Sequence, residues 1–396
     1  MMCTSSLLHR REVLVGLGGL IAAGSATALA CDMPRHPPCH AVALVPLTGP
    51  LALIGQEMAA GIRAMGDQLR EIDPSSRGHL LIGIVDSLSD PAKTVEGIQR
   101  MVGINPAPAA IVAADLLLSA ETLSRLANSL KIPFISLVTA PHGSPSEWLC
   151  QLPPTAMQAA QGLLGYLKAA GMRSDQPINI VYTTSRTTRA SEFATAIRAS
   201  NITVGLQVNL ADNSGRDLTP LAADIPRAQK DSAWMVSTPA PAAAPIINLV
   251  QQKHGSVPIV VDAGLADPAL ILRGANAARG LVALSSFSPE LIDRRPFLRQ
   301  INTRVQQVLQ RPITPAAALA ATAAQVLAEA VVRANVRDNA YAEATRDALR
   351  AVSIGANELI MPWESVRFDK ESFQNQGARV VALGLREDRV VTMWSG

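Results

Sequence analysis

The chain has 396 residues, of which 48% are hydrophobic, 17% charged and 3% aromatic, and its formal net charge is +3. A chain of this length is too long for one ordinary core, so it favours two domains or two lobes. The near-neutral charge excludes the strongly basic surface by which nucleic-acid-binding proteins are recognised. The composition therefore describes a well-packed globular protein.

The first thirty residues have the pattern of an export signal. Arg10 and Arg11 precede an apolar stretch softened by glycine, and Ala28-Leu29-Ala30 fits the small-x-small rule for cleavage. We expect residues 1–30 to be a signal peptide, either of the twin-arginine type or of the ordinary secretory type. Cleavage after residue 30 would make Cys31 the first residue and a candidate for lipid attachment.

Two cysteines lie in a Pro-rich linker at 31–40, and a third follows at position 150. If Cys31 is acylated, Cys39 and Cys150 are an even pair in a compartment that permits disulfides. If it is not, one thiol is left over. The linker also contains four side chains that could be interpreted as metal ligands: Cys31, His36, Cys39 and His40. Their spacing is not that of a standard zinc site, so we expect neither a metal nor another cofactor.

Apolar runs alternate with amphipathic stretches in the first part of the chain. We expect strands at 41–45, 79–85, 109–113 and 133–136, and helices that begin beyond residue 55, at residue 91 and near residue 120. Asp90-Pro91 is an N-cap followed by proline at the first helical position. Strand–helix alternation at this spacing implies a parallel sheet.

The alternation stops at a polar turn at 142–146 and then starts again, which indicates a second lobe of the same architecture. We expect strands at 178–182, 202–208, 233–237, 257–261 and 281–285, and helices at 155–170, 189–200, 217–229, 241–254, 290–311 and 315–335. Thr314-Pro315 is a second helix start of the cap-then-proline kind. Short strands follow at 365–368, 378–385 and 389–394.

Several of these stretches together resemble the periplasmic solute-binding proteins of branched-chain amino-acid ABC transporters. The resemblance rests on the opening at 42–61, on Val85-Asp86 with 90–93, on 132–136, on Arg216-Asp217, and on 366–369, 374–375 and 390–394. It implies a type I periplasmic binding fold, an α/β structure like that of the leucine-binding protein. Such a fold has two doubly wound parallel-sheet lobes joined by about three hinge crossovers, here expected near 143–152, 262–283 and 360–366.

The same resemblance implies how the chain is divided. We expect residues 41–148 plus 283–363 to form the first lobe, and residues 149–282 plus 364–396 to form the second. The lobes would close on a ligand by a hinge motion.

Ligands in open α/β sheets bind at the carboxyl ends of the strands, so the loops there form the candidate site. The residues that we expect to contact the ligand are Thr48, Gly49, Pro50, Asp115, Leu117, Ser119, Val138, Thr139, Ala140, Ser185, Arg186, Thr188 and Thr238. Most are apolar or carry a hydroxyl group. Only Asp115 and Arg186 are charged, and Arg186 is interpreted either as a clamp for a carboxylate or as a solvated residue at a helix start.

The amino-acid site of the resembled family does not carry over to this sequence. Its ligand-holding hydroxyl residues fall on Leu117 and Ala140, no tyrosine occurs in the loop after Tyr182, and no acidic residue occurs near Ala240. A bare zwitterion would lose charge-assisted hydrogen bonds in such a cleft. We therefore expect a small, neutral or monocarboxylate organic ligand rather than a free branched-chain amino acid.

The resemblance implies a periplasmic, monomeric protein that binds a small organic molecule and delivers it to the membrane permease of an ABC transporter. Neither nucleic acid nor membrane is an expected partner, apart from the lipid anchor at Cys31. We expect no enzyme, because Ser119, His142 and Asp115 can be written as a triad but lack a nucleophile-elbow sequence. The alternative function is a ligand sensor or regulatory partner protein of the cell envelope with no role in transport.

Overall fold

A computed structural model describes residues 39–77, 80–103, 107–138, 147–212, 217–275, 280–334 and 341–396. The predicted signal peptide, the lipid attachment at Cys31 and most of the linker lie outside these residues. All described helices and strands belong to one unit, residues 36–396, which is considered by itself below.

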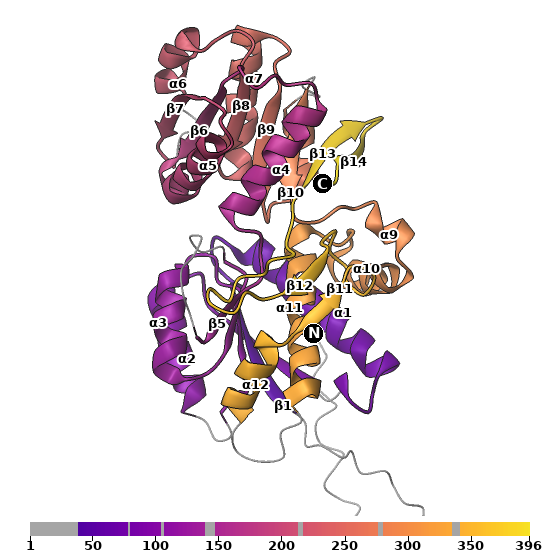
Figure 1. Ribbon diagram of the computed structural model, residues 1–396. Helices are drawn as coiled ribbons and strands as arrows, with labels where there is room; N and C mark the ends of the chain where they lie inside the picture. Colours follow the sequence, from indigo (N-terminus) through magenta and orange to yellow (C-terminus); the bar gives the residue numbers. More distant parts are fainter. Residues whose placement is uncertain are drawn as a thin grey trace, which may run out of the picture. The chain divides into compact units, whose positions relative to one another are not determined.

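The first lobe is built on a five-stranded parallel sheet with the strand order β2-β1-β3-β4-β5. Figure 1 labels β1 and β5 of this sheet in the lower lobe. Its strands are β1 Cys39–Val45, β2 Leu80–Asp86, β3 Ile111–Ala113, β4 Phe134–Ser136 and β5 Leu149–Gln151. The helices between them are α1 Ala52–Ile72, α2 Pro91–Val102 and α3 Ala120–Leu130. The helix start predicted at Asp90-Pro91 is confirmed, since the Asp90 side chain accepts hydrogen bonds from the backbone N–H groups of Ala92 and Lys93.

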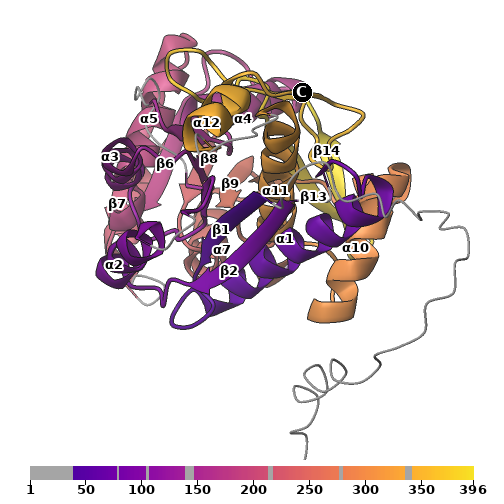
Figure 2. The ribbon, with the colours of Figure 1, turned by 90° about the horizontal axis from the view of Figure 1, so that it is seen from below.

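Helices cover both faces of this sheet because its strands are apolar on both sides. Ala43 and Val45 of β1 pack into the core that contains α1 and α11, whereas Leu44 between them packs with α2 and α3. The chain returns to this lobe with α9 Leu291–Arg294, α10 Pro296–Leu309, α11 Pro315–Ala334 and α12 Tyr341–Arg350. Figure 2 shows α1 and α11 on one side of β1 and β2, with α2 and α3 on the other.

The central helix of the first core is α11, which is apolar along its length. Among the helices that the structure describes, it is the one with the length and hydropathy of a membrane-spanning segment, yet 78% of that window is buried inside the protein. Its start is the predicted cap, because the hydroxyl of Thr314 accepts a hydrogen bond of 3.3 Å from the backbone N–H of Ala317. This burial indicates a core helix.

The second lobe is built on a seven-stranded sheet with the order β14-β13-β10-β9-β8-β6-β7. The parallel strands are β6 Ile178–Thr183, β7 Val204–Leu210, β8 Ala233–Ser237, β9 Ile259–Gly264 and β10 Leu281–Ser285. The remaining two, β13 Val381–Arg386 and β14 Arg389–Trp394, are antiparallel. Its helices are α4 Ala156–Ala169, α5 Thr187–Ala199, α6 Thr219–Asp224, α7 Ala240–His254 and α8 Pro268–Gly274.

The two faces of the second sheet also have separate cores. One contains α6, α7 and α8, and the other contains α4 and α5, so successive apolar residues of one strand point to opposite cores. Val181 and Ile180 of β6 show this alternation. The α/β class, the two lobes and the parallel-dominated sheets are therefore as the sequence predicted.

The chain passes from one sheet to the other three times. The second and third passages lie further along the sequence than the residues predicted for them. It leaves the first sheet after Gln151, leaves the second after Ser285, and returns before Val381. The boundary expected at residue 283 falls inside β10, which is hydrogen-bonded on both sides within the second sheet. A short ribbon of β11 Ser353–Gly355 and β12 Ser365–Arg367, which packs with the first core, precedes the third passage. The predicted division of the chain into lobes otherwise stays a prediction.

Proline explains two helices that are shorter than predicted. The helix expected at 217–229 ends at Asp224 and continues as a single 3₁₀ turn, Ile225–Arg227, that contains Pro226. The helix expected at 290–311 is split because the residue before Pro296 is extended, with φ −120° and ψ 108°.

The connecting segments near the third passage are held together by Asn375, which is 1% exposed. Its Oδ1 accepts hydrogen bonds of 3.2 Å from the backbone N–H groups of Arg367 and Gly377, and its Nδ2 donates one of 3.3 Å to the carbonyl of Leu152. Its backbone N–H also bonds the carbonyl of Gln151. The side chain of Asn375 thus bonds the first segment that passes between the lobes, at Leu152, and the third, at Arg367 and Gly377.

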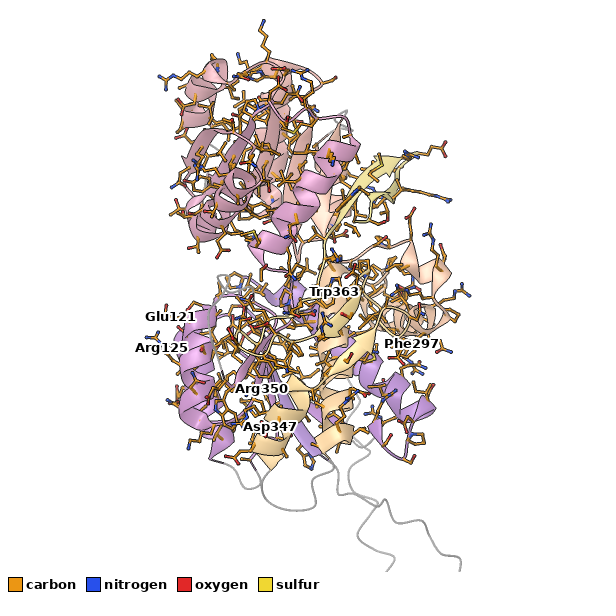
Figure 3. The ribbon with its side chains drawn as sticks, viewed as in Figure 1. Glu121, Arg125, Phe297, Asp347, Arg350 and Trp363 are labelled. Carbon is orange, nitrogen blue, oxygen red and sulfur yellow. The ribbon has the colours of Figure 1, made fainter. Side chains whose placement is uncertain are left out.

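Two aromatic residues surround this region. Trp363, labelled in Figure 3, is buried and donates a hydrogen bond of 3.0 Å from its indole nitrogen to the carbonyl of Arg379. Arg350 at the end of α12, also labelled there, lies with its guanidinium carbon 5.2 Å from the ring centre of Phe373. The passages are therefore packed as well as hydrogen-bonded.

The sequence allowed a disulfide between Cys39 and Cys150 if Cys31 is acylated, and the structure does not contain it. Cys150 is a buried free thiol on β5, and Cys39 opens β1. Strands β3 and β4 lie between β1 and β5, so these two strands run about 14 Å apart. A disulfide needs Cα atoms within about 7 Å of each other. The strand order, which the sequence did not reveal, excludes the pair.

Candidate ligand-binding site

Each sheet has one place where the strand order reverses, and such a switch point is where ligands bind in open α/β sheets. In the first sheet it lies between β1 and β3, and in the second between β6 and β8. The loops at the carboxyl ends of these four strands contain most of the predicted ligand-binding residues. The candidate site therefore has a first-lobe half and a second-lobe half.

Thr48, Gly49 and Pro50 follow β1 at the first switch point, and all three are exposed. The Thr48 hydroxyl donates a hydrogen bond of 2.7 Å to Asp86, the last residue of β2. Gly49 has φ +82°, and a β-carbon on it would lie 2.9 Å from the side chain of Ser89. Thr48 thus lies where it was predicted, but its hydroxyl shapes the loop.

The carboxylate of Asp86 organises that loop. It accepts hydrogen bonds from the backbone N–H groups of Leu47, Thr48 and Leu88 at 2.9, 3.3 and 2.8 Å, besides the one from the Thr48 hydroxyl. Burial raises the pKa of Asp86, but these donors together outweigh it and leave the pKa below the usual value. Three of the four bonds are to Oδ1 and one is to Oδ2, so this carboxylate holds the loop together.

Asp115, after β3, is 1% exposed and has a structural role. Its carboxylate accepts hydrogen bonds of 2.8 Å from the hydroxyl of Thr94 on α2 and 3.0 Å from the backbone N–H of Leu117. Ser119, two residues on, caps α3 by accepting from the backbone N–H of Thr122 at 3.1 Å. The prediction of Asp115 as a charged ligand contact is therefore not supported.

Leu117 and Val138 provide the apolar part of the first-lobe half. The side chain of Leu117 is 47% exposed, which leaves a large apolar surface at the switch point. Val138 is half-buried and is fixed by hydrogen bonds of 3.0 Å between its backbone and the hydroxyl of Ser136. Thr139, Ala140 and His142 lie outside the described residues.

In the second-lobe half, β6 ends in a 3₁₀ turn, Thr184–Arg186. The exposed Ser185 donates its backbone N–H to Asp212 at 3.0 Å, and the hydroxyl of Thr184 lies 3.3 Å from the carbonyl of Leu210. Hydrogen bonds from Ser185 hold the pKa of Asp212 below its usual value, and the charge of Arg186 adds to the effect. Thr188, on the first turn of α5, is exposed.

A buried ion pair that the sequence did not reveal lies beneath this turn. Arg189 of α5 donates from Nε and, at 3.0 Å, from Nη2 to the carboxylate of Asp262 on β9, with side chains 16% and 3% exposed. Ser237 adds a hydroxyl 3.4 Å from that carboxylate. Burial raises the pKa of Asp262, but the pairing with Arg189 holds it below the usual value. An aspartate inside the apolar run of β9 was the available signal.

Two groups of the second-lobe half have unused hydrogen-bonding capacity. The hydroxyl of Thr238, which directly follows β8, is buried and has no partner among the described residues. Arg186 is half-buried, and no described carboxylate lies within ion-pair distance of it. Its charge is nevertheless close enough to lower the pKa of Asp262. Of the predicted contacts that the structure describes in this half, Arg186, Thr238 and the exposed Thr188 are left available for a polar ligand group.

A surface cavity of about 190 Å³ lies elsewhere, at the amino end of β2. It is lined by Ile62, Arg63, Gly66, Asp67, Leu69, Arg70, Arg77, Leu80, Ile82 and Ala324. Asp67 is already paired with Arg70, and Arg77 with Glu329. We place the candidate site at the switch points, because that is where open α/β sheets bind ligands, and not at this cavity.

The whole chain can now be compared with known proteins. A family model described as periplasmic binding protein matches residues 40–383. Among curated proteins, none matches the chain. The solved structures that resemble it share a low sequence identity, so their likeness concerns the fold.

Three of these structures differ in the ligand or in the molecule transported. A branched-chain amino acid transporter substrate-binding protein from Streptococcus pneumoniae, in complex with isoleucine, has 14% identity and a TM-score of 0.69, over 90% of this chain and 99% of that one. A solute-binding protein of an ABC transporter from R. palustris, in complex with benzoate, has 14% identity and a TM-score of 0.69, over 91% and 96%. A fatty acid ABC transporter substrate-binding protein from Thermomonospora curvata has 14% identity and a TM-score of 0.71, over 91% and 92%.

The match spans both lobes and their connections, and the neighbouring structures have the same two-lobed α/β architecture. The resemblance found in the sequence is thereby confirmed. The chain belongs to the periplasmic binding protein family, with the type I fold of the substrate-binding proteins of branched-chain amino-acid ABC transporters.

Proposed function

We propose that the protein is an extracytoplasmic solute-binding protein that delivers a small organic ligand to the permease of an ABC transporter. The observation that carries this proposal is that each lobe has a switch point with exposed loops. A ligand held by both halves would favour a closed arrangement of the lobes, because only that arrangement lets all contacts form at once.

The ligand class is open within the family. Related proteins were solved in complex with isoleucine, leucine or benzoate, and one belongs to a fatty acid ABC transporter. For this chain, the first-lobe half offers the exposed Leu117 and half-buried Val138. A mostly apolar wall with few polar groups suits a small organic molecule other than a free branched-chain amino acid.

The proposal is for a binding protein rather than an enzyme. The two histidines that the structure describes are His40 and His254. His40 lies at the amino end of β1, and His254 ends α7 with its ring 5.6 Å from that of Trp234. Neither is at a switch point, so neither can act as a general base on a ligand bound there.

Export is part of the proposal. A cleaved signal at residues 1–30 would place the protein outside the cytoplasm, where a transporter's binding protein works. The mass of the protein recovered from the cell envelope tests this, since the mature chain should lack these residues. An added diacylglycerol mass on Cys31 would identify a lipid-anchored form, whereas an intact Met1 would contradict export by cleavage.

The binding function is tested by native mass spectrometry of the protein purified from its own host, which should reveal a co-purified small molecule. Adding that molecule at a hundred times its dissociation constant should stabilise the fold by about 2.7 kcal/mol in a thermal-shift assay. Small-angle scattering should then show a smaller radius of gyration. Binding with no compaction would contradict hinge closure while leaving ligand binding intact.

A further inference from the structure

The hydrogen-bonding groups at the two switch points are unevenly used, and this imbalance limits what the ligand can be. Among the described residues, four carboxylates lie within the switch-point strands and their neighbours or within two residues of the carboxyl ends of these strands: Asp86, Asp115, Asp212 and Asp262. If a ligand carried an ammonium group, these four would be the first candidates to receive it. Their present contacts therefore decide whether such a ligand can be held.

In the first lobe both carboxylates are engaged in internal hydrogen bonds. Oδ1 of Asp86 accepts three backbone hydrogen bonds, and its Oδ2 accepts one from the hydroxyl of Thr48. Asp115 is 1% exposed and is bonded to Thr94 and to the backbone N–H of Leu117. Asp115 is closed to a ligand group by burial, and at Asp86 a ligand cation would have to compete with four internal donors.

In the second lobe the buried carboxylate is neutralised from within. Asp262 is held bidentately by Arg189 and is 3% exposed. Exchanging Arg189 for a ligand cation would leave a buried guanidinium without a partner, which is strongly unfavourable. Asp212 is exposed to water and accepts the backbone N–H of Ser185. It is therefore the weakest of the four as a site for a desolvated ion pair.

Donors, by contrast, are in excess. Arg186 carries five N–H donors and lies three residues before Arg189, whose charge is balanced by Asp262. The buried hydroxyl of Thr238 has no partner among the described residues. An arginine fork is the side chain best suited to hold a carboxylate, because two parallel N–H groups match its two oxygens.

Resting on the proposed function, we infer that the ligand is an organic monocarboxylate that lacks an ammonium group, and that Arg186 recognises its carboxylate. The neighbouring Arg189 does not take part, since its fork is occupied by Asp262. Arg186 is accordingly the residue that determines specificity for charge.

The test uses three molecules with one carbon skeleton: 4-methylpentanoate, its amide, and leucine, which adds only the α-amino group. A second trio of 3-phenylpropanoate, its amide and phenylalanine covers an aromatic ligand. Calorimetry with the mature chain at pH 7 should give a dissociation constant for the carboxylate on the order of tenfold or more below those of the amide and the amino acid.

Two variants assign the preference. Arg186→Gln should bring the carboxylate and the amide to within about twofold of each other, whereas Arg186→Lys keeps the charge without the fork and should give an intermediate ratio. The control is Arg173→Gln. Arg173 is exposed at the opposite end of β6, where it pairs with Asp175 and Asp231, and its loss should leave the ratio unchanged.

The outcomes separate this inference from the proposed function. Tighter binding of leucine or phenylalanine than of the carboxylates overturns the inference but supports a solute-binding protein, as does a preference for the carboxylate that Arg186→Gln leaves intact. If neither trio binds, the charge of the co-purified host ligand decides between the outcomes. A monoanion supports the inference, and a zwitterion or a cation overturns it. If no small molecule is found by either route, both proposals fail.

Discussion

A β-carbon added to Gly61 of α1 would lie 2.0 Å from the carbonyl oxygen of Ala317 in α11. The two helices therefore pack backbone against backbone at this point, in the middle of the first core. No side chain can be accommodated there without moving one helix, since the atom in the way belongs to the main chain. Gly61 is what allows the buried helix α11 to lie so close to α1.

The close approach predicts a difference between two glycines of the same helix. Gly61→Ala should destabilise the first lobe by about 1–3 kcal/mol through overpacking. Gly66→Ala should be neutral or stabilise by up to about 1 kcal/mol, because its nearest neighbour is the flexible end of Arg70 at 3.7 Å and alanine favours the helix. Urea unfolding followed by circular dichroism measures both. Equal midpoints for the two variants would show that the helices can separate freely.

Breaking the Arg189–Asp262 pair should be costly. Asp262→Asn leaves the buried guanidinium without its charge partner, and we expect a loss of about 3–5 kcal/mol in unfolding free energy. Asp231→Asn is the control, because that carboxylate is exposed and its removal should change stability little. Denaturant titration at pH 7 compares them. A loss in Asp262→Asn no larger than in the control would mean that the pair contributes nothing.

The same pair predicts a pH dependence with a definite sign. The pKa of Asp262 in the folded protein is depressed, so its contribution is present above the pKa of an unfolded aspartate, about 3.9, and is lost as pH falls through the folded-state value. Wild-type stability should therefore decrease more steeply below about pH 4 than that of Asp262→Asn. Parallel curves from pH 7 down to pH 2 would contradict the assignment.

The side chain of Asn375 should matter more than its small size suggests. Asn375→Ala leaves two backbone N–H groups and one backbone carbonyl without this partner, at about 1–3 kcal/mol for each group that stays buried and unpaired. Its neighbour Gln376 is exposed, so Gln376→Ala should cost far less. Thermal unfolding of the two variants gives the comparison. Hydrogen exchange should localise the change to the segments that pass between the lobes, and a uniform change would argue against this role.

The thiol of Cys150 should be inert in the folded protein. It is fully buried, and burial raises its pKa well above the usual value, so very little thiolate is present at neutral pH. A chromogenic disulfide reagent should label it only in denaturant. Peptide mapping that found Cys150 labelled rapidly under native conditions, or joined to Cys39, would contradict the structure.

Local rules predicted the local structure well. Asp90-Pro91 and Thr314-Pro315 both start helices as expected, because a cap and a proline act on the next few residues alone. The order of the strands does not follow from such rules. β10 is separated from its antiparallel partner β13 by the whole of residues 286–380, and nothing in its apolar sequence states on which sheet it lies.

The sequence predicted which loops carry the candidate residues, but not what their polar atoms contact. Thr48 and Asp115 do follow switch-point strands, yet their polar atoms bond Asp86 and Thr94, which are distant in sequence. A hydroxyl or carboxyl in a loop is available to a ligand only if no such partner takes it, and the partner is set by packing. Arg189 was likewise missed, since its partner Asp262 lies 73 residues away.

The way in which β13 and β14 complete the second sheet has a consequence for biosynthesis. Until residues 381–394 have left the ribosome, β10 is an unprotected strand edge, made almost wholly of apolar residues. The edge of β10 stays unpaired while helices α9 to α12 of the first lobe are still being synthesised. It is therefore exposed to edge-to-edge aggregation or to capture by chaperones, up to the moment when the last hairpin covers it.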